Sequence, residues 1–266
     1  MDIYKITRPK VQRIPILLSI PHAGTLFPED LIDEYKPEML PPDDTDWFVD
    51  QLYGFAAEMG ISTISAMYSR WIIDLNRNPD STPLYTDGRV ITSLCTTSNF
   101  LGTPIYKDER TVVDLTEVQR RKALYFDPYQ QKVQALLDEL KTQFGQVLLW
   151  DCHSIRRHVP AIQTAVFPDL ILGSADETSA APSLINTARQ NLSSTYQINH
   201  NTPFKGGYIT RHFGQPNNNQ HALQLEMSKN LYMDDTEIQY DQNRAQRVQH
   251  TLKQCLQVMQ TTLTTL

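Results

Sequence analysis

Two histidines stand at the ends of apolar runs of strand length. His22 follows the run at 14–20, and His153 lies at the end of the run that starts at Val147. In open α/β sheets, ligands bind in the crevice outside the carboxyl ends of the strands. Two imidazoles and one carboxylate, with a fourth position left to water, make up the usual catalytic zinc site. Although a single histidine in a loop is more often a structural or surface residue, we expect these two to meet in one metal site.

Several acids could supply the third ligand of such a site. Asp43, Asp44 and Asp46 precede an expected helix, and Asp151 lies two residues before His153. Acids in a first helical turn also cap free amides, but three of them within four residues exceed what a cap needs. Asp151 would point to the same side of its strand as His153, where it could instead orient the imidazole. The residue pattern by itself leaves the choice among these acids open.

Side chains suited to an anionic ligand follow another apolar run. Asn76 and Arg77 stand side by side, and Arg70 and Arg211 could join them. A guanidinium can hold a carboxylate through two parallel hydrogen bonds. Taken singly, each arginine has a plainer role at the solvated surface. Gly207, the second of two consecutive glycines, indicates only a tight turn or a close approach of the backbone.

One acid is suited to general-base chemistry. Glu226 follows the mostly apolar run at 222–225. Burial at the end of a strand would raise the pKa of its carboxyl group toward the range in which a general base works. Its plainer role is that of an acid at the amino end of a helix.

Composition excludes several classes of partner. The 266 residues carry a formal net charge of −6 without a basic tract, so we expect no nucleic-acid or membrane partner. No segment approaches the roughly 18 uninterrupted apolar residues of a membrane helix, and we expect no signal peptide. Three cysteines without paired spacing argue against a disulfide framework. We therefore expect a cytoplasmic protein with a small-molecule ligand, and the sequence predicts no oligomeric state.

Strands and helices are expected to alternate along the chain. The apolar patterns predict strands at 14–20, 61–65, 71–73, 147–151, 168–173 and 222–225. They predict one helix from Asp43 to Met59 and a pair of helices that is broken at Pro128 and ends at Gly145. Two further helices are predicted at 182–191 and 241–262.

The remaining segments look irregular. Residues 1–13 form a polar lead-in, and 78–110 and 202–220 lack periodicity. A loop as long as 78–110 is usually functional, and it could close over the site as a lid. The alternation of strands and helices predicts an α/β sheet with helices on both faces, in a single domain that spans residues 1–266.

Six sequence blocks, read together, resemble the N-formylglutamate amidohydrolase (N-formylglutamate deformylase) family. Any one block alone would be weak evidence, but six in the family's order are specific, and together they extend over nearly the whole chain. The blocks are residues 19–24, 44–47, 68–77, 149–156, 204–211 and 223–226.

The resemblance implies a fold and a reaction. The family is related to zinc carboxypeptidases and to aspartoacylase-like zinc acylases, which implies a mixed central sheet of about eight strands flanked by helices. The implied reaction is the zinc-dependent hydrolysis of N-formyl-L-glutamate to L-glutamate and formate, a step of histidine degradation.

The resemblance also implies roles for individual residues. It places His22 and His153 on one Zn²⁺ ion and makes Glu226 the general base. In the carboxypeptidases a His-x-x-Glu motif supplies a further ligand, but Thr25 stands at that position here. We therefore assign the third ligand to Asp46, with Asp44 as the alternative.

The arginines and their neighbours complete the site that the resemblance implies. Asn76 and Arg77 would bind a carboxylate of the substrate, with Arg211 and Gly207 beside them. Arg70 would stabilise the oxyanion that forms during hydrolysis.

Two other functions stay open at this point. The first is a zinc deacylase that acts on another N-acyl amino acid, since the size of the pocket decides which acyl group is accepted. The second is a non-catalytic protein that binds dicarboxylates through its arginines. Glu226 argues against the second, because a binder of anions has no need of a carboxylate that faces its ligand.

Overall fold

The centre of the computed structural model, which describes residues 2–80 and 93–266, is one mixed β-sheet. The described residues contribute seven strands: β1 (Tyr4–Thr7), β2 (Ile16–Ile20), β3 (Ser62–Ala66), β4 (Val147–Ile155), β5 (Leu170–Gly173), β6 (Ile198–His200) and β7 (Gln220–Ser228). Their order across the sheet is β1-β3-β2-β4-β7-β5-β6. Strands β3, β2, β4 and β7 run parallel, whereas β1 pairs antiparallel with β3 and β5 pairs antiparallel with β7.

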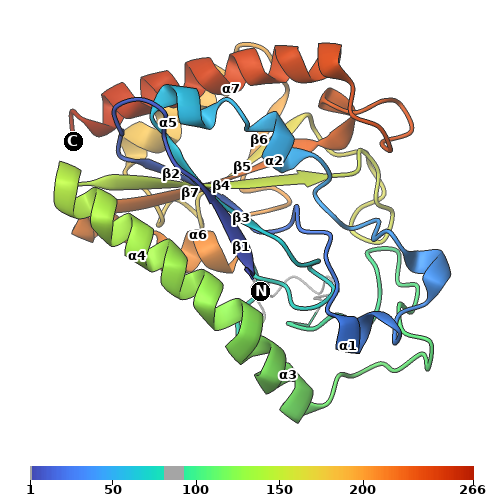
Figure 1. Cartoon of the computed structure of the whole chain (residues 1–266). Coiled ribbons are helices and arrows are strands. Elements are labelled where there is room, and N and C mark those ends of the chain that lie inside the picture. The colour runs from blue at the N-terminus through green and yellow to red at the C-terminus, as the bar shows by residue number, and fades with distance from the viewer. Residues whose placement is uncertain (1, 81–92) are drawn as a thin grey trace.

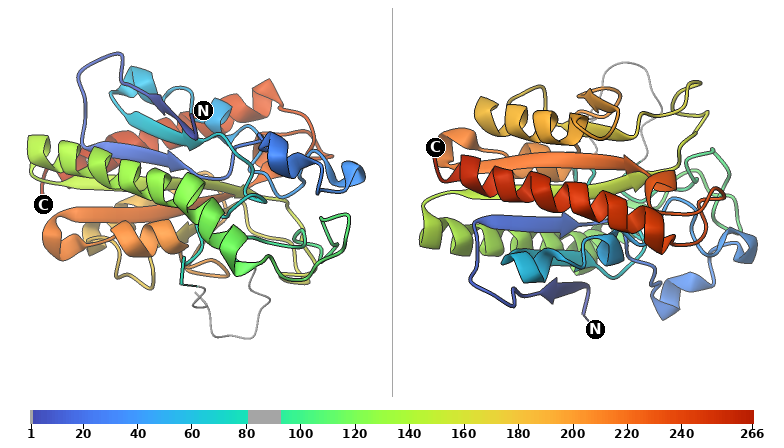
Figure 2. Two further views of the ribbon diagram at one scale, coloured as in Figure 1. Left: turned by 60° about the horizontal axis from the view of Figure 1, so that its bottom comes forward. Right: turned by 90° about the horizontal axis from the view of Figure 1, so that it is seen from above.

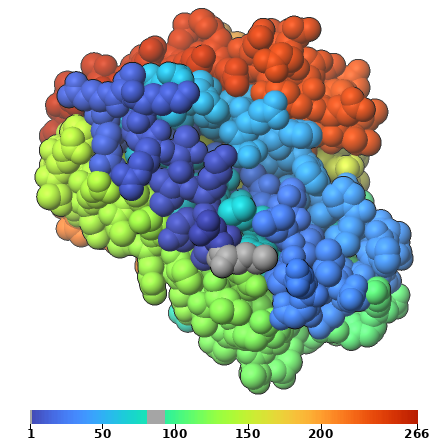
Figure 3. Space-filling model, in the orientation of Figure 1, coloured from blue at the N-terminus to red at the C-terminus, as the bar shows by residue number. Residues whose placement is uncertain are grey.

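Helices cover both faces of this sheet. Those of the described residues are α1 (Glu29–Ile32), α2 (Val49–Leu52), α3 (Leu115–Arg121), α4 (Asp127–Phe144), α5 (Pro182–Ser193), α6 (Tyr208–Phe213) and α7 (Gln242–Leu263). Helices α5 and α7 lie on one face, and α4 and α6 lie on the other (Figures 1 and 2). In the space-filling view, α7 runs along one margin and the α3–α4 segment along the opposite one (Figure 3). Among the described residues, no helix combines the length and apolarity that crossing a bilayer would require.

The central strands are apolar on both faces, as is expected for parallel strands that are covered on both sides. On β4, Leu148 and Trp150 pack in the core beneath α5 and α7, whereas Leu149 packs in the core beneath α4. Because side chains alternate along a strand, Asp151 and His153 share the face of Leu149. The polar end of β4 therefore projects on the side of α4 and α6.

The sheet topology brings three chain segments together at the carboxyl ends of the central strands. Strand β4 lies between β2 and β7, and His153 is in register with Glu226 of β7. His22 comes two residues after the end of β2. The carboxyl ends of three neighbouring parallel strands therefore carry His22, His153 and Glu226, three of the residues that were predicted to do chemistry.

The α/β class, the mixed sheet and the two helical layers are confirmed. The sheet of the described residues has seven strands, where the resemblance implied about eight. The organisation of residues 1–266 as one domain stays a prediction. Helices α5 and α7 fall within two residues of their predicted ends, and Gly145, at a φ of 81°, ends α4 as expected.

Two predicted elements are wrong. The segment 71–73 forms a turn rather than a strand. The helix predicted from Asp43 to Met59 is reduced to α2 and a short 3₁₀ turn, because Phe48 adopts a left-handed φ of 62° just before α2. Strands β1 and β6 were not predicted, since they are short and only partly buried. Of the irregular segment 78–110, residues 81–92 lie outside the described residues.

Candidate metal centre and active site

The three predicted metal ligands lie together in the structure. His22, Asp46 and His153 are buried, and one potential ligand atom from each lies within 4.8 Å of the other two. The carboxylate oxygen Oδ2 of Asp46 is 3.1 Å from Nδ1 of His153 and 3.7 Å from Nδ1 of His22. The two imidazole ring centres are 4.8 Å apart. Asp44, the alternative third ligand, is not part of this group.

One buried carboxylate contacts the Nε2 side of each imidazole. Nε2 of His22 is 2.8 Å from Oδ1 of Asp74, and Nε2 of His153 is 3.0 Å from Oδ2 of Asp151. Each Nδ1 atom is thereby turned toward Asp46. A carboxylate behind a ligating histidine fixes the orientation and tautomer of the ring.

A divalent metal ion fits these residues. Nδ1 of His22 is buried and has no hydrogen-bond partner, although buried polar atoms are nearly always paired. Two imidazole nitrogens and a carboxylate oxygen that converge in this way are the donor set of a catalytic zinc site. The unpaired Nδ1 atom of His22 is therefore what we expect of a nitrogen that ligates a metal ion.

Asp46 reaches the site through a loop that other segments hold in place. Its main-chain NH donates to the carbonyl of His22 at 2.9 Å. The side chain of Lys229, which is only 2% exposed, donates to the carbonyls of Thr45 at 2.7 Å and Asp43 at 3.3 Å. These bonds hold the segment 43–46 as a loop, where the sequence pattern predicted a helix. Lysine is ordinarily a surface residue, so no pattern in the sequence indicated this role.

Asn76 connects both imidazole–carboxylate pairs. Its main-chain NH donates to Oδ1 of Asp74 at 2.9 Å, and its side-chain Nδ2 donates to Oδ2 of Asp151 at 3.2 Å and lies 2.9 Å from Nε2 of His153. Its Oδ1 accepts from the NH of Ile209 at 2.8 Å. The structure thus places the Asn76 amide behind the imidazoles, where it bonds to residues of the protein.

Two of the three predicted arginines, Arg70 and Arg77, lie beside the carboxylates of this group. Arg70 is buried, and its Nη2 donates to Oδ2 of Asp74 at 2.7 Å while its Nη1 lies 3.9 Å from Oδ1 of Asp46. Arg77 is more exposed, with Nη2 at 3.7 Å from Oδ2 of Asp74. Nε of Arg211 donates to the carbonyl of Gly206 at 2.9 Å. Asp74, which lies in the block 68–77 but was not predicted as a site residue, therefore connects Arg70 and Arg77 to His22.

Gly207 allows the backbone to approach Asn76 closely. A Cβ atom at this position would lie 2.5 Å from Cγ of Asn76, closer than such atoms can approach. The NH of Gly207 donates to Oε1 of Gln224 at 2.8 Å. The glycine is thus required by packing behind the site.

Burial and neighbouring charges set the protonation states. Burial raises the pKa of the half-buried Glu226 to about 7. Burial opposes the charged form of Asp74 as well, but Arg70 and Arg77 outweigh it and hold the pKa of Asp74 well below its usual value. Glu226 can therefore exchange a proton near neutral pH, whereas Asp74 stays ionised.

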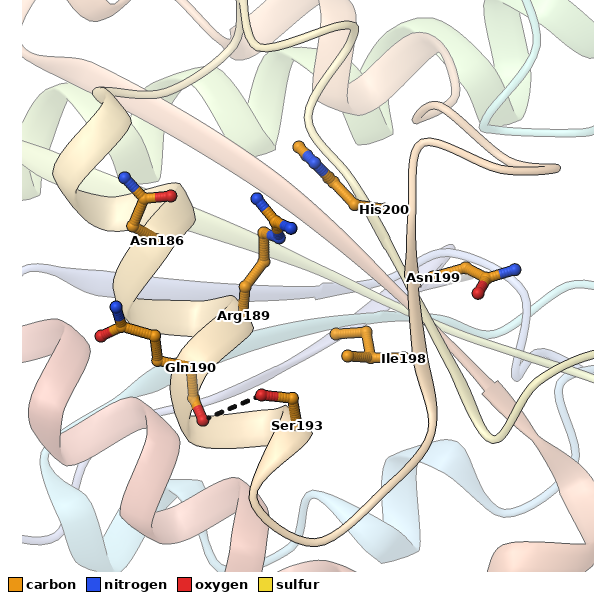
Figure 4. Close-up of a pocket in the computed structure, with 7 residues that line it drawn as sticks. All are labelled: Asn186, Arg189, Gln190, Ser193, Ile198, Asn199 and His200. Atoms are coloured by element: carbon orange, nitrogen blue, oxygen red, sulfur yellow. Dashed lines mark hydrogen bonds between the residues drawn. The ribbon is translucent and has the colours of Figure 1, made fainter.

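A pocket of about 410 Å³ lies away from this centre, between α5 and β6. Figure 4 shows Arg189 on the helix and His200 on the strand, with their side chains directed toward the space between the two elements. None of the predicted site residues lines this pocket; its lining is Asn186, Arg189, Gln190, Ser193, Ile198, Asn199 and His200.

A mixed α/β sheet with a buried group of potential metal ligands, a carboxyl group of raised pKa and a buried arginine beside them is typical of a metal-dependent hydrolase. Comparison with known proteins identifies the family within this class. Residues 14–233 match the family described as N-formylglutamate amidohydrolase, and the chain belongs to that family.

Relatives extend over nearly the whole chain. An N-formylglutamate deformylase of Pseudomonas putida is 39% identical over 250 residues, which cover 93% of this chain and 92% of the relative. One of Pseudomonas aeruginosa is 40% identical over 225 residues, 84% of each chain. The crystal structure of N-formylglutamate amidohydrolase from Ralstonia eutropha JMP134 superposes with a TM-score of 0.82 at 25% identity and covers 98% of this chain and 99% of that one.

A more distant structure shares the fold. A gene product of Agrobacterium tumefaciens superposes with a TM-score of 0.71 at 14% identity, covering 97% of this chain and 96% of that one. The family resemblance predicted from the six sequence blocks is confirmed, and with it the assignment of the chain as a hydrolase that acts on an amide.

Proposed function

We propose that this protein hydrolyses N-formyl-L-glutamate to L-glutamate and formate with one zinc ion. The observation that carries the proposal is the buried, unpaired Nδ1 of His22, which faces Asp46 beside His153. Relatives that are named for this reaction, at 39% and 40% identity, support the choice of substrate. A cytoplasmic location stays a prediction from the sequence.

His22, Asp46 and His153 would hold the metal ion. Bound there, zinc would polarise the formyl carbonyl and lower the pKa of a coordinated water from about 15.7 toward about 7. The chain itself keeps the two imidazoles aligned through Asp74 and Asp151. It also keeps the aspartate loop in place through Lys229 and the His22 carbonyl.

Glu226 acts as the general base. Its carboxylate removes a proton from the attacking water as the oxygen bonds to the formyl carbon. It then gives that proton to the amine nitrogen as the C–N bond breaks, and formate and glutamate leave. A pKa of about 7 suits both transfers at neutral pH.

We propose that Arg70 stabilises the negative charge that develops on the carbonyl oxygen. Its guanidinium lies beside Asp46, with Nη1 at 3.9 Å from Oδ1. Removing one such donor typically costs about 10²–10³ in rate. We propose that Arg77 and Arg211 bind the two carboxylates of the substrate.

Asn76 and Gly207, which the family resemblance implied would bind substrate, take a different role in this proposal. The Asn76 amide already bonds to Asp151 and to the NH of Ile209, and Gly207 packs directly on Asn76. We propose that both are positioning residues that align His153.

A substrate panel and a metal determination test this function together. We expect the zinc-loaded protein to release formate from N-formyl-L-glutamate much faster than it cleaves N-acetyl-L-glutamate or N-succinyl-L-glutamate. Removal of the metal with a chelator should abolish turnover, and added zinc should restore it. Faster cleavage of another N-acyl amino acid would identify a different deacylase. Tight binding without turnover would identify a binding protein.

A further inference from the structure

Phe100 lies directly against the arginine that is placed to receive the carbonyl oxygen. The Cζ atom of Arg70 is 4.7 Å from the centre of the Phe100 ring. The guanidinium also donates to Asp74 and approaches Asp46. A carbonyl oxygen that accepts from Arg70 would therefore bind within reach of the Phe100 ring.

The position of Phe100 is fixed relative to Arg70. The NH of Phe100 lies 3.1 Å from each carboxylate oxygen of the buried Asp44, so it donates to that group. The same carboxylate accepts from the indole NH of Trp71 at 3.0 Å, and Trp71 is the residue after Arg70. One buried carboxylate thus holds both the phenylalanine and the backbone next to the arginine.

The turn around Phe100 is built from its own hydrogen bonds. Oδ1 of Asn99 accepts from the NH groups of Leu101 at 3.0 Å and Thr103 at 2.8 Å. The main-chain NH of Asn99 donates to the carbonyl of Thr103 at 3.0 Å. Such turns hold the backbone in one conformation, so the backbone that carries the ring is held in place without a ligand.

Phe100 joins an apolar wall beside the general base. It packs against a small core cluster that includes Ile155 and Ile171. Ile155 lies two residues beyond His153 on β4 and so shares its face, and Ile171 is directly opposite Glu226 in the β5–β7 pair. The wall therefore reaches from Arg70 to the neighbourhood of Glu226.

We propose that Phe100, supported by Ile155 and Ile171, determines the size of the acyl group that the enzyme accepts. This inference rests on the proposed deformylation. The carbonyl carbon lies between Arg70 and the base, so the remaining substituent on that carbon meets the wall. The hydrogen of a formyl group needs little space, whereas the methyl group of an acetyl substrate must occupy space that the ring fills.

The test compares two substrates on three variants. The ratio of kcat/KM for N-acetyl-L-glutamate to kcat/KM for N-formyl-L-glutamate is measured for wild type, Phe100→Ala and Phe100→Leu. Leu101→Ala is the matched control, because Leu101 is the next residue of the same turn and is 55% exposed. Room for one methyl group is worth about 10–200-fold in discrimination. We therefore expect the ratio to rise at least about tenfold in Phe100→Ala and less in Phe100→Leu, with no change in the control.

A ratio that stays within about twofold of wild type in both Phe100 variants overturns the inference, even if both rates fall. Such a result would mean that the ring only supports Arg70. If Phe100→Ala does not fold, Phe100→Leu decides between the outcomes, because it removes less of the packing. Failure of the proposed function itself looks different, since wild type would then release no formate from N-formyl-L-glutamate.

Discussion

At the scale of single residues, the proposed metal centre depends on which nitrogen of each imidazole faces Asp46. Asp74 and Asp151 occupy the Nε2 side of His22 and His153, so both rings present Nδ1 to Asp46. Histidine can ligate a metal through either nitrogen. The carboxylates behind the rings therefore decide the geometry as much as the ligands do.

This role predicts the behaviour of Asp151→Asn. The substitution keeps the shape of the side chain but removes the charge that holds His153. Loss of such a partner typically costs about 10–100-fold in metal affinity. Competition with a chromophoric chelator should show that loss, while Asp138→Asn, on the exposed side of α4, should bind zinc as wild type does. Equal affinity in Asp151→Asn and wild type would contradict the assignment.

Glu226 predicts a pH dependence. Only its carboxylate form can accept a proton, and burial raises its pKa to about 7. The value of kcat/KM should therefore rise as the pH increases toward 7 and level off above it, and a bound divalent cation would move this rise to lower pH. Rates measured from pH 5 to pH 9 on the zinc-loaded enzyme check the direction.

The neutral variant isolates the same group. Glu226→Gln should retain zinc, because Glu226 is not part of the ligand group, and should lose about 10²–10⁴ in kcat. Its zinc content and its circular dichroism spectrum serve as controls. Near-normal turnover in this variant would remove Glu226 from the mechanism.

Some residues of the candidate site could be predicted from the sequence, and others could not. His22, Asp46 and His153 could be predicted, because strand ends and a family resemblance both indicate them. The bridging of Asp74 and Asp151 by Asn76 could not, since it depends on hydrogen bonds between segments far apart in the chain. Lys229 and Phe100 also contact the site only through tertiary packing.

At the scale of elements, the segment from Asp43 to Met59 shows where local patterning fails. Its apolar spacing fits a helix, but Asp44 and Asp46 bond to distant segments instead. A continuous helix would carry both carboxylates away from those partners. Tertiary hydrogen bonds thus outweigh a helical preference that is worth only tenths of a kcal/mol per residue. The buried strands β2, β4 and β7 were predictable, because short and mostly apolar runs are typical of strands that are covered on both faces.

The contact between β7 and the start of α5 predicts a change of stability with pH. Nδ1 of the buried His221 accepts from the NH of Ala181 at 3.3 Å, and burial lowers the pKa of His221 from 6.5 to about 4. Between these two values the unfolded chain binds more protons than the folded one. The contribution of His221 to the free energy of unfolding should therefore be fully present above pH 6.5 and decrease as the pH falls toward 4.

Urea unfolding of wild type and His221→Gln at several pH values measures this contribution. The variant cannot titrate at this position, so its free energy of unfolding should depend less on pH in that window. The difference between the two proteins should be largest near pH 7.5 and smaller near pH 5. Parallel curves across the window would show that His221 is not responsible.

At the scale of the whole molecule, the proposed ion would join segments from both halves of the chain. Its ligands would come from His22 after β2, Asp46 in the loop before α2 and His153 near the end of the adjacent strand β4. An ion that binds only the folded state stabilises it by about 2.7 kcal/mol when its free concentration is 100 times the Kd. For a chain of this size that corresponds to a Tm increase of roughly 5–10 °C.

Thermal unfolding with and without added zinc checks this prediction. Wild type treated with a chelator should gain that increase when zinc is restored. His153→Ala, which lacks one ligand, should not. An equal increase in both proteins would indicate that zinc binds elsewhere.

The close packing of Gly207 on Asn76 limits how this chain can diversify. Any side chain at position 207 would push against the Asn76 amide, which lies 2.9 Å from Nε2 of His153, so a single substitution there should displace one of the proposed metal ligands. A library randomised at position 207 alone should return glycine under selection for activity. Randomising 76 and 207 together should return other pairs only where a smaller residue at 76 makes room for a larger one at 207.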